Sequence, residues 1–302
     1  MAGHSLTTGL QAMHASLAFG ALINPQAMDD AVAAVWQSFN ALPVTHHCMF
    51  EACLAVAAFV VWIFFFESLH FAFPFVLDSR LDGQPPRGAL RGFAADLHKT
   101  TVPAFTYLAS IALWHHFGLG MLLFGSRPAW FGEPSFLRVV TEVSIGVFLY
   151  DLFFYPFHMA FHRLGPPRWK SLHTRHHRWA RTEDAAHNAV ETVQNSYADA
   201  GIQVFINICV QQISPWGFKH PLSRALHNLM VTYLLTEAHS GYDLPFMSHR
   251  LFPRVLGGPV RHEAHHQSGA IYYHQFFTYL DDFFGFTPAN ALKLARLKQS
   301  QK

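Results

Sequence analysis

Residues 139–157, VVTEVSIGVFLYDLFFYPF, lead without a break into the segment His158-Met-Ala-Phe-His162. The apolar part approaches the roughly 20 residues that a helix needs to cross a bilayer. On the continuation of that helix, two histidines spaced i,i+4 lie on one face, within reach of a single metal ion. The stretch therefore predicts an apolar helix that carries metal ligands at its C-terminal end.

Two further histidine groups follow, and both have the pattern HxxHH. They are His173-Thr-Arg-His176-His177 and, near the C-terminus, His262-Glu-Ala-His265-His266. A lone HxxxH pair is usually structural, but three groups of imidazoles beside a membrane are costly to bury without a partner. Eight histidines exceed what one four-coordinate zinc ion uses, so we predict two metal ions. Imidazole suits iron, zinc and copper alike, and the ligand type does not name the metal.

The composition favours a chain embedded in lipid. Of 302 residues, 51% are hydrophobic, 15% are aromatic and only 13% are charged, which is about half the charged share of an ordinary soluble domain. The three cysteines, Cys48, Cys53 and Cys209, form no CxxC pair and predict no disulfide framework. A net charge of +2 without a basic stripe predicts no nucleic-acid partner.

The pattern of apolar segments predicts an all-α integral membrane protein with about four transmembrane helices and a cytosolic helical cap that holds a histidine-bound dimetal site. Two late segments, separated by Pro215, Gly217 and Pro221, predict a helical hairpin. Ala31–Leu42 predicts an amphipathic helix at the membrane interface. In chain order, the candidate spans are Cys53–Phe66, Phe105–Phe124, Val139–Phe157 and the hairpin segments Ala200–Ile213 and Ala225–Leu235.

The placement of Lys and Arg predicts the orientation. No Lys or Arg occurs before Arg80, and the positive residues then gather in particular loops. Because positive loops favour the cytosol, we expect the histidine groups and the C-terminus there and the N-terminus in the lumen. The first 45 residues lack a positive segment, which predicts no cleaved signal peptide. The positive residues are Arg80, Arg87, Arg91 and Lys99; Arg163, Arg168, Lys170, Arg175, Arg178 and Arg181; Arg250, Arg254 and Arg261; and the tail Lys293–Lys302.

These patterns divide the chain into two parts. Residues 1–135 form an N-terminal segment with the first two spans, and residues 136–302 form a histidine-box domain. The combination HxxxH, HxxHH and HxxHH resembles the fatty acid hydroxylase/sterol desaturase superfamily. The likeness covers roughly Asp151 to Gly285, nearly half of the chain.

Flanking segments extend the resemblance. Asp151-x-x-x-Tyr155 is similar to the family's DxxxYxxHRxxH, with Met159 where Arg is common. Tyr272 falls where the family usually has Asn. Three other segments are similar to family motifs: residues 186–191 to AHPxE with Asn188 in place of Pro, residues 239–243 to the HSGY(D/E) of 4-methylsterol oxidases, and residues 281–285 to WDRxFGT.

The resemblance implies a multi-pass enzyme of the endoplasmic reticulum membrane that holds two iron ions (Fe2+/Fe3+), activates O2 and oxidises a lipid C–H bond. Electrons from NAD(P)H are expected through a reductase and a separate cytochrome b-type carrier, since the chain has no haem-binding HPGG segment. The HSGYD and AHxxxE segments favour 4-methylsterol oxidation in sterol biosynthesis. Fatty-acyl or sphingoid hydroxylation and sterol desaturation stay open. A non-catalytic membrane metal-binding protein and a zinc hydrolase are remoter alternatives, because the histidines gather at one face and are too many for a single zinc ion.

The predicted site has nine metal ligands and no catalytic residue beyond the metal centre. His239 joins the ligands because it returns to the cytosolic side at the end of the hairpin. Glu237 and Glu263 are expected at the surface or behind the ligands, and the pairs His46-His47 and His115-His116 are expected not to bind metal. The supporting candidates behind the ligands are His187, Glu191, Asp243, Tyr273 and His274, of which Asp243 is expected to fix an imidazole tautomer. The ligands are His158, His162, His173, His176, His177, His239, His262, His265 and His266.

Overall fold

The computed structural model describes residues 24–83, 97–128, 131–163, 173, 176–177 and 187–289. Helices dominate these residues, and within them only isolated β-bridges occur and no strand. The all-α prediction is therefore confirmed. Several positions used in the sequence analysis lie outside the described residues: Arg87, Arg91, Arg168, Lys170, Arg175, Arg178, Arg181, Ala186 and the tail Lys293–Lys302.

The longer helices are α2 (Pro25–Asn40), α3 (Phe50–Ala72), α5 (Leu97–His116), α7 (Phe136–Arg163), α9 (Tyr197–Val210), α10 (Pro221–Ala238) and α12 (Gly258–Ser268). The shorter α-helices are α6 (Leu119–Phe124), α11 (Ser248–Leu251) and α13 (Tyr279–Phe284). Three 3-10 helices complete the set: η1 (Pro43–His46), η2 (Pro74–Ser79) and η3 (Ala189–Val193).

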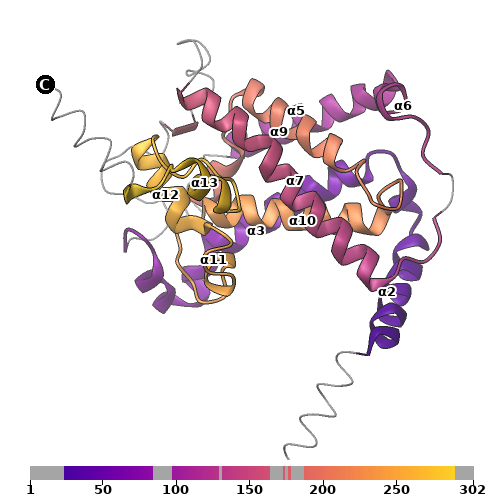
Figure 1. The fold of residues 1–302 in the computed structure, drawn as a ribbon, viewed down its shortest axis with the longest axis horizontal. Helices are drawn as coiled ribbons and strands as arrows, with labels where there is room; N and C mark the ends of the chain where they lie inside the picture. The colour runs from indigo at the N-terminus through magenta and orange to yellow at the C-terminus, as the bar shows by residue number, and fades with distance from the viewer. Residues whose placement is uncertain are drawn as a thin grey trace, which may run out of the picture.

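Helix α10 is the centre of the arrangement. It packs along α3 and against α7, and α9 packs against α7. Figure 1 shows α12 and α13 at one end of the molecule and α2 and α6 at the other, with α3, α7 and α10 running between them. Because α12 also packs against α10, the histidines of α12 meet the C-terminal end of the central helix.

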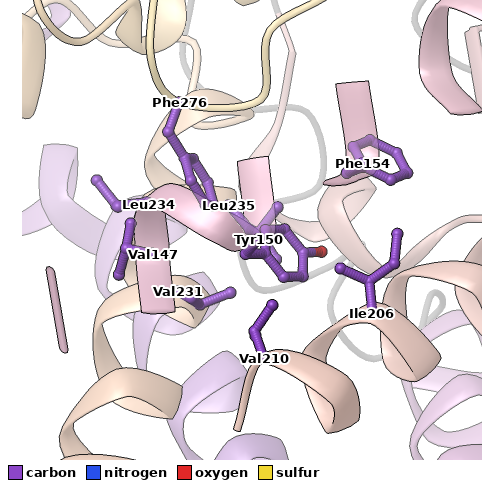
Figure 2. Close-up of a cluster of buried hydrophobic side chains, with 9 residues drawn as sticks. All are labelled: Val147, Tyr150, Phe154, Ile206, Val210, Val231, Leu234, Leu235 and Phe276. Atoms are coloured by element: carbon purple, nitrogen blue, oxygen red, sulfur yellow. The ribbon is translucent and has the colours of Figure 1, made fainter. Parts of the chain in front are cut away.

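The main core joins α7, α9 and α10. Their apolar side chains point toward one another around Tyr150 (Figure 2). The ring of Tyr150 stacks on Phe276, with ring centroids 5.6 Å apart, so the segment between α12 and α13 is packed into the same core. Burying each large apolar side chain contributes roughly 1.5–3 kcal/mol. This core fixes the histidine end of α7 relative to the histidine end of α10.

The predicted membrane architecture is only partly supported. Helix α3 contains the predicted span Cys53–Phe66, and it is the one helix in the described part of the chain that is long and apolar enough to cross a membrane. The prediction of one continuous helix over Phe105–Phe124 is wrong. Gly118 adopts a left-handed φ of 62° between α5 and α6, a conformation that ends a helix and that hydropathy does not register.

The other predicted spans are helical but shorter or more polar than a lipid-facing span. Helix α7 has 28 residues and includes buried Glu142 and Asp151, and α9 has only 14 residues. Helices α9 and α10 cover the two segments of the predicted hairpin, and the Gln211 side chain after α9 donates to Asn228 of α10 (2.9 Å). Four crossings are therefore not established by these helices.

The predicted interfacial segment Ala31–Leu42 falls on helix α2. Asn24 caps this helix by accepting from the backbone N–H of Gln26 (3.0 Å), and proline follows as the first helical residue. Trp36 is buried against the ring of His220, with centroids 4.4 Å apart. Part of the apolar face of α2 therefore packs on protein.

Candidate metal centre

All nine predicted ligand histidines converge at the end of the molecule where α7, α10 and α12 meet. They form two groups, and within each group the ligand nitrogens lie within 4.8 Å of one another. Eight of the nine side chains are buried. We call the groups the five-histidine group (His158, His162, His173, His177 and His265) and the four-histidine group (His176, His239, His262 and His266).

The structure explains the HxxHH pattern. In each motif the outer i,i+4 pair serves one group, and the remaining histidine serves the other. His262 and His266 lie in the four-histidine group, whereas His265 lies in the five-histidine group. The neighbouring residues His176 and His177 are likewise divided between the groups. Adjacent side chains on a helix point about 100° apart, so a pair of consecutive histidines is suited to reach two neighbouring ions.

The spacing of the imidazole nitrogens fits metal coordination. In the four-histidine group, the Nε2 atom of His239 is 3.1 Å from that of His176 and 2.9 Å from that of His262. The Nε2 atoms of His262 and His266 are 3.0 Å apart. Two nitrogens bound at right angles to one ion at about 2.1 Å lie about 3.0 Å apart. The observed separations match that arrangement.

The groups also contain buried polar atoms that have no partner among the described residues. In the five-histidine group these include the Nε2 atoms of His158 and His265. A buried imidazole nitrogen without a hydrogen bond is costly, and coordination to an ion removes that cost. The donor set, nine imidazoles and no carboxylate, suits iron, copper or zinc.

Electrostatics keeps the ligands in the form that binds metal. Burial, followed by repulsion from neighbouring imidazoles, holds the pKa of His262, His265 and His266 well below the usual value. Burial lowers the pKa of His239 to about 3. These rings are therefore neutral near pH 7, and a neutral imidazole offers the lone pair that a metal requires.

Backbone carbonyls fix the orientation of several rings. The Nδ1 atom of His158 lies 2.7 Å from the carbonyl oxygen of Tyr273, and that of His265 lies 2.7 Å from the carbonyl of Ile271. The Nδ1 atom of His239 lies 2.8 Å from the carbonyl of Leu235. Since a carbonyl only accepts, Nδ1 carries the proton and Nε2 is left for the metal.

One supporting residue was missed by the sequence analysis. The Asp199 carboxylate, fully buried near the start of α9, accepts from Nδ1 of His173 (2.7 Å) and from Gln203 (3.1 Å). Gln203 in turn accepts from the hydroxyl of Tyr150 (3.2 Å). The signal in the sequence was weak: an acidic residue in an otherwise apolar helix, three residues after the N-cap Ser196.

Two aspartates in the motifs hold the C-terminal segment on α7. Asp151 accepts from three successive backbone N–H groups, those of Gln275, Phe276 and Phe277 (2.7–3.1 Å). Asp281 accepts from the Tyr155 hydroxyl (2.9 Å) and from the backbone of residues 273 and 274. The motifs that contain Asp151 and Asp281 therefore fix the position of the Tyr273 carbonyl, which contacts His158. The ring of Tyr273 lies beside the five-histidine group, with its centroid 5.4 Å from that of His265.

The segment His239–Asp243 is fixed by its own close packing. Gly241 has φ of +70°, and a Cβ at this position would lie 2.3 Å from the carbonyl oxygen of His187. The guanidinium of Arg80 donates to the carbonyls of Ser240 (3.0 Å) and His187 (3.2 Å). The HSGYD sequence thus has a local structural role in positioning His239.

His187 lies against the four-histidine group, with its ring centroid 4.1 Å from that of His266. Its Nδ1 and backbone N–H both contact Glu263 (2.6 and 3.0 Å). Burial alone raises the pKa of Glu263, but the hydrogen bonds and charge of His187 hold that pKa below its usual value. Glu191 lies 3.8 Å from Nε2 of His187, and burial raises its pKa. Both predicted supporting residues, with Glu263, therefore line this group.

One expectation needs correction. Asp243 does not contact a predicted ligand imidazole. It pairs with His249 (2.8 Å) and Arg250, and the tautomer of His239 is set by a backbone carbonyl instead. His274, another predicted supporting residue, is buried, and its Nδ1 contacts Asp281. It belongs to the support of the C-terminal segment.

Other polar residues have local roles. Glu237 is buried and accepts from Ser248 and the Tyr233 hydroxyl (2.9 Å), which fixes the start of α11. Tyr272 adopts a positive φ of 54°, a conformation that Asn tolerates better than Tyr, so the family's usual Asn suits the backbone at this position. The pairs His46-His47 and His115-His116 are not part of either histidine group.

Comparison with known proteins agrees with the geometry. A family model described as Fatty acid hydroxylase matches residues 143–286. A cholesterol 25-hydroxylase-like protein of Danio rerio is 30% identical over 249 residues, 78% of this chain and 93% of that protein. The cholesterol 25-hydroxylase of Mus musculus is 26% identical over 156 residues, 50% of this chain and 48% of that protein. No solved structure gives a significant match. The chain belongs to the fatty acid hydroxylase/sterol desaturase superfamily.

Proposed function

We propose that this protein is a membrane-bound di-iron hydroxylase that inserts oxygen from O2 into a C–H bond of a lipid, with a sterol as the favoured substrate. The observation that carries the proposal is the convergence of nine histidines, eight of them buried, into two adjacent groups at the end of an apolar cavity. The family match supports a lipid hydroxylase. Iron, the electron donors and the membrane topology are parts of the proposal.

The apolar cavity lies between α3, α5, α7, α9 and α10 and has a volume of about 180 Å³. Thr192, Asn195, Gln203 and Leu235 line both this cavity and a smaller one of about 20 Å³. Histidines of both groups line the smaller cavity: His158, His173, His176, His239, His262 and His266. A hydrocarbon in the apolar cavity therefore has its end directed at both groups.

The reaction needs a metal because an unactivated C–H bond offers neither an acidic proton nor an electrophilic carbon. Bound iron supplies the O2-dependent oxidation, in which R–H, O2, two electrons and two protons give R–OH and water. The electrons are expected from NAD(P)H through a separate cytochrome b-type carrier and its reductase.

The protein's own part is to hold the metal ions, orient the lipid and exclude water from the site. The five-histidine group would hold one ion and the four-histidine group the other, through neutral imidazoles fixed by Asp199 and by backbone carbonyls. Ions held by these five and four nitrogens would supply the chemistry that uses O2. The apolar walls of the cavity keep bulk water from the reacting carbon and align one carbon with the ions.

The relatives favour a sterol as the lipid substrate. The HSGYD and AHxxxE segments suggested 4-methylsterol oxidation, but the packing of Gly241 and His187 gives those residues a structural reason that is independent of the substrate. The relatives are named for oxidation of cholesterol. Fatty-acyl or sphingoid hydroxylation and sterol desaturation are the alternative reactions.

For membrane location we propose the endoplasmic reticulum, with the metal centre and C-terminus cytosolic and the N-terminus lumenal. The support is the apolar helix α3, which precedes the first positive residue, Arg80, at its C-terminal side. A tag at the N-terminus is expected to be protected from protease in sealed microsomes, while a C-terminal tag is cleaved. The reverse pattern would overturn the orientation.

Metal analysis combined with turnover tests the central proposal. The full-length protein in detergent is expected to bind two irons per chain and to consume O2 when lipid and a reductant are supplied. His265→Ala is expected to lose iron and activity, whereas His249→Ala, outside both groups, retains both. If His265→Ala keeps its iron and its turnover, the assignment is wrong. Two irons without lipid-dependent O2 uptake would indicate a metal-binding protein instead.

A further inference from the structure

A second large cavity, of about 620 Å³, lies at the end of the molecule opposite the histidines. The starts of α3 and α10, the end of α9 and helix α6 surround it. In contrast to the apolar cavity, its wall includes charged side chains. Arg224 and Glu51 form a partly buried bidentate ion pair there, and Gln211 and Asn228 lie beside them. We call it the polar cavity.

The polar cavity adjoins the apolar one. Tyr107, Asn207 and Asn228 line both, just as other residues are shared between the apolar cavity and the histidines. Three cavities thus follow one another along α10, from the polar end to the metal centre. Asn228 and His239 are eleven residues apart on or next to this helix, which corresponds to about 16 Å. One leaflet of a bilayer has a hydrocarbon depth of about 15 Å.

One buried atom indicates what the polar cavity binds. The side chain of Gln211 is almost fully buried, at 2% exposure, and its Oε1 has no hydrogen-bond partner among the described residues. Its Nε2 donates to the carbonyl of Arg224 (3.1 Å) and to Oδ1 of Asn228 (2.9 Å), both acceptors. The amide orientation is thereby fixed, and Oε1 requires a donor.

The available donors narrow the chemistry. Arg224 already gives its guanidinium to Glu51 and to the carbonyl of Gln211 (2.6 Å). Its positive charge is thus neutralised by a carboxylate, and a second arginine of the wall, Arg127, donates to the side-chain oxygen of Gln212 (3.1 Å). A ligand carboxylate would place a second hydrogen-bond acceptor next to Oε1 of Gln211, which is itself an acceptor without a donor. A neutral hydroxyl supplies the missing donor.

Resting on the proposed function, we propose that the polar cavity holds the hydroxyl end of a lipid alcohol through Gln211, and that the hydrocarbon end of the same molecule passes through the apolar cavity to the metals. The volumes of the two cavities agree with this order, because the larger one, of about 620 Å³, has room for a bulky end and the smaller one, of about 180 Å³, for a slender chain. The hydroxylation then falls on a carbon remote from the existing hydroxyl. Oxidation at the carbon next to the hydroxyl, as in 4-methylsterol oxidation, requires the opposite order.

Binding of a matched pair of ligands tests the hydroxyl contact without requiring turnover. Cholesterol and its 3-methyl ether differ by the loss of the donor hydrogen, while the oxygen acceptor remains. The full-length protein in detergent is expected to bind the alcohol about five- to tenfold more tightly than the ether. Gln211→Met is expected to bind both with similar Kd. The control Gln37→Met, whose side chain contacts Glu133 (2.7 Å) and lines none of these cavities, is expected to keep the preference.

Equal affinity of the unaltered protein for alcohol and ether overturns the proposal, as does a preference that persists in Gln211→Met. Stronger binding of palmitate than of cholesterol, measured at a pH at which palmitate is ionised, also overturns it, because a carboxylate has no hydrogen to donate. These measurements do not depend on iron, so a failed iron test leaves the lipid site intact, and a failed lipid test leaves the metal centre intact. In the active enzyme, mass spectrometry of the product is expected to place the new oxygen at the hydrocarbon end, and oxygen beside the original hydroxyl is a contrary result.

Discussion

Replacing Asp199 by Asn should weaken metal binding, although this residue is not a ligand. The carboxylate accepts one hydrogen bond from Nδ1 of His173 and one from Gln203. An amide of the same size has only one oxygen, so at least one of these bonds is lost, together with the charge that supports the imidazole. Removing such an outer partner costs about 10- to 100-fold in metal affinity, or about 1.4–2.7 kcal/mol.

The matched control is Asp243→Asn. The sequence suggested Asp243 as an imidazole partner, but its carboxylate pairs with His249 and the exposed Arg250, a kind of contact that contributes little. Iron per chain is measured after dialysis against a graded series of chelator concentrations, and thermal unfolding of the metal-free proteins checks that each variant is folded. Asp199→Asn should lose iron at 10- to 100-fold lower chelator strength, and Asp243→Asn within twofold of the unaltered protein. Unchanged iron in Asp199→Asn, or an equal loss in Asp243→Asn, would refute the reasoning.

Three further outcomes are expected. Gly241→Ala should lower the free energy of unfolding by at least about 2 kcal/mol, because the added Cβ would meet a backbone carbonyl at a position with a left-handed φ. The control Gly201→Ala, where no atom lies near the added Cβ, should not lower this free energy. Calorimetry of the two variants measures the difference. Tyr272→Asn should leave the free energy of unfolding unchanged, whereas Tyr272→Val should lower it by about 1–2 kcal/mol, because φ is positive at this position. Equal stability of the two variants contradicts this. In the metal-free protein, the free energy of unfolding should be highest above pH 6.5 and fall as the pH drops toward 3, because His239 binds a proton in the unfolded chain but not when it is buried in the fold. Denaturant titrations across this pH range measure the direction of the change.

The sequence by itself predicted the helical fold and the nine histidines that gather in the two groups. Spacings such as that of His262 and His266 are local, and a helix turns them into a shared face whatever surrounds it. The long apolar run of α3 was equally readable, because its composition alone favours a helix of that length. Polar residues such as Asp151 were recognised by resemblance, but their contacts with the backbone of another segment were not.

Only the tertiary structure decided how the histidines are divided between two groups and which residues stand behind them. His173 and Asp199 meet because the core of α7, α9 and α10 brings their segments together, and no local spacing encodes that contact. The same holds for the break at Gly118 and for the order of the three cavities along α10. Periodicity depends on neighbours in the chain. The division of the histidines between two groups, the carboxylates that support them and the positions of the cavities depend on the packing of helices that are distant in the sequence.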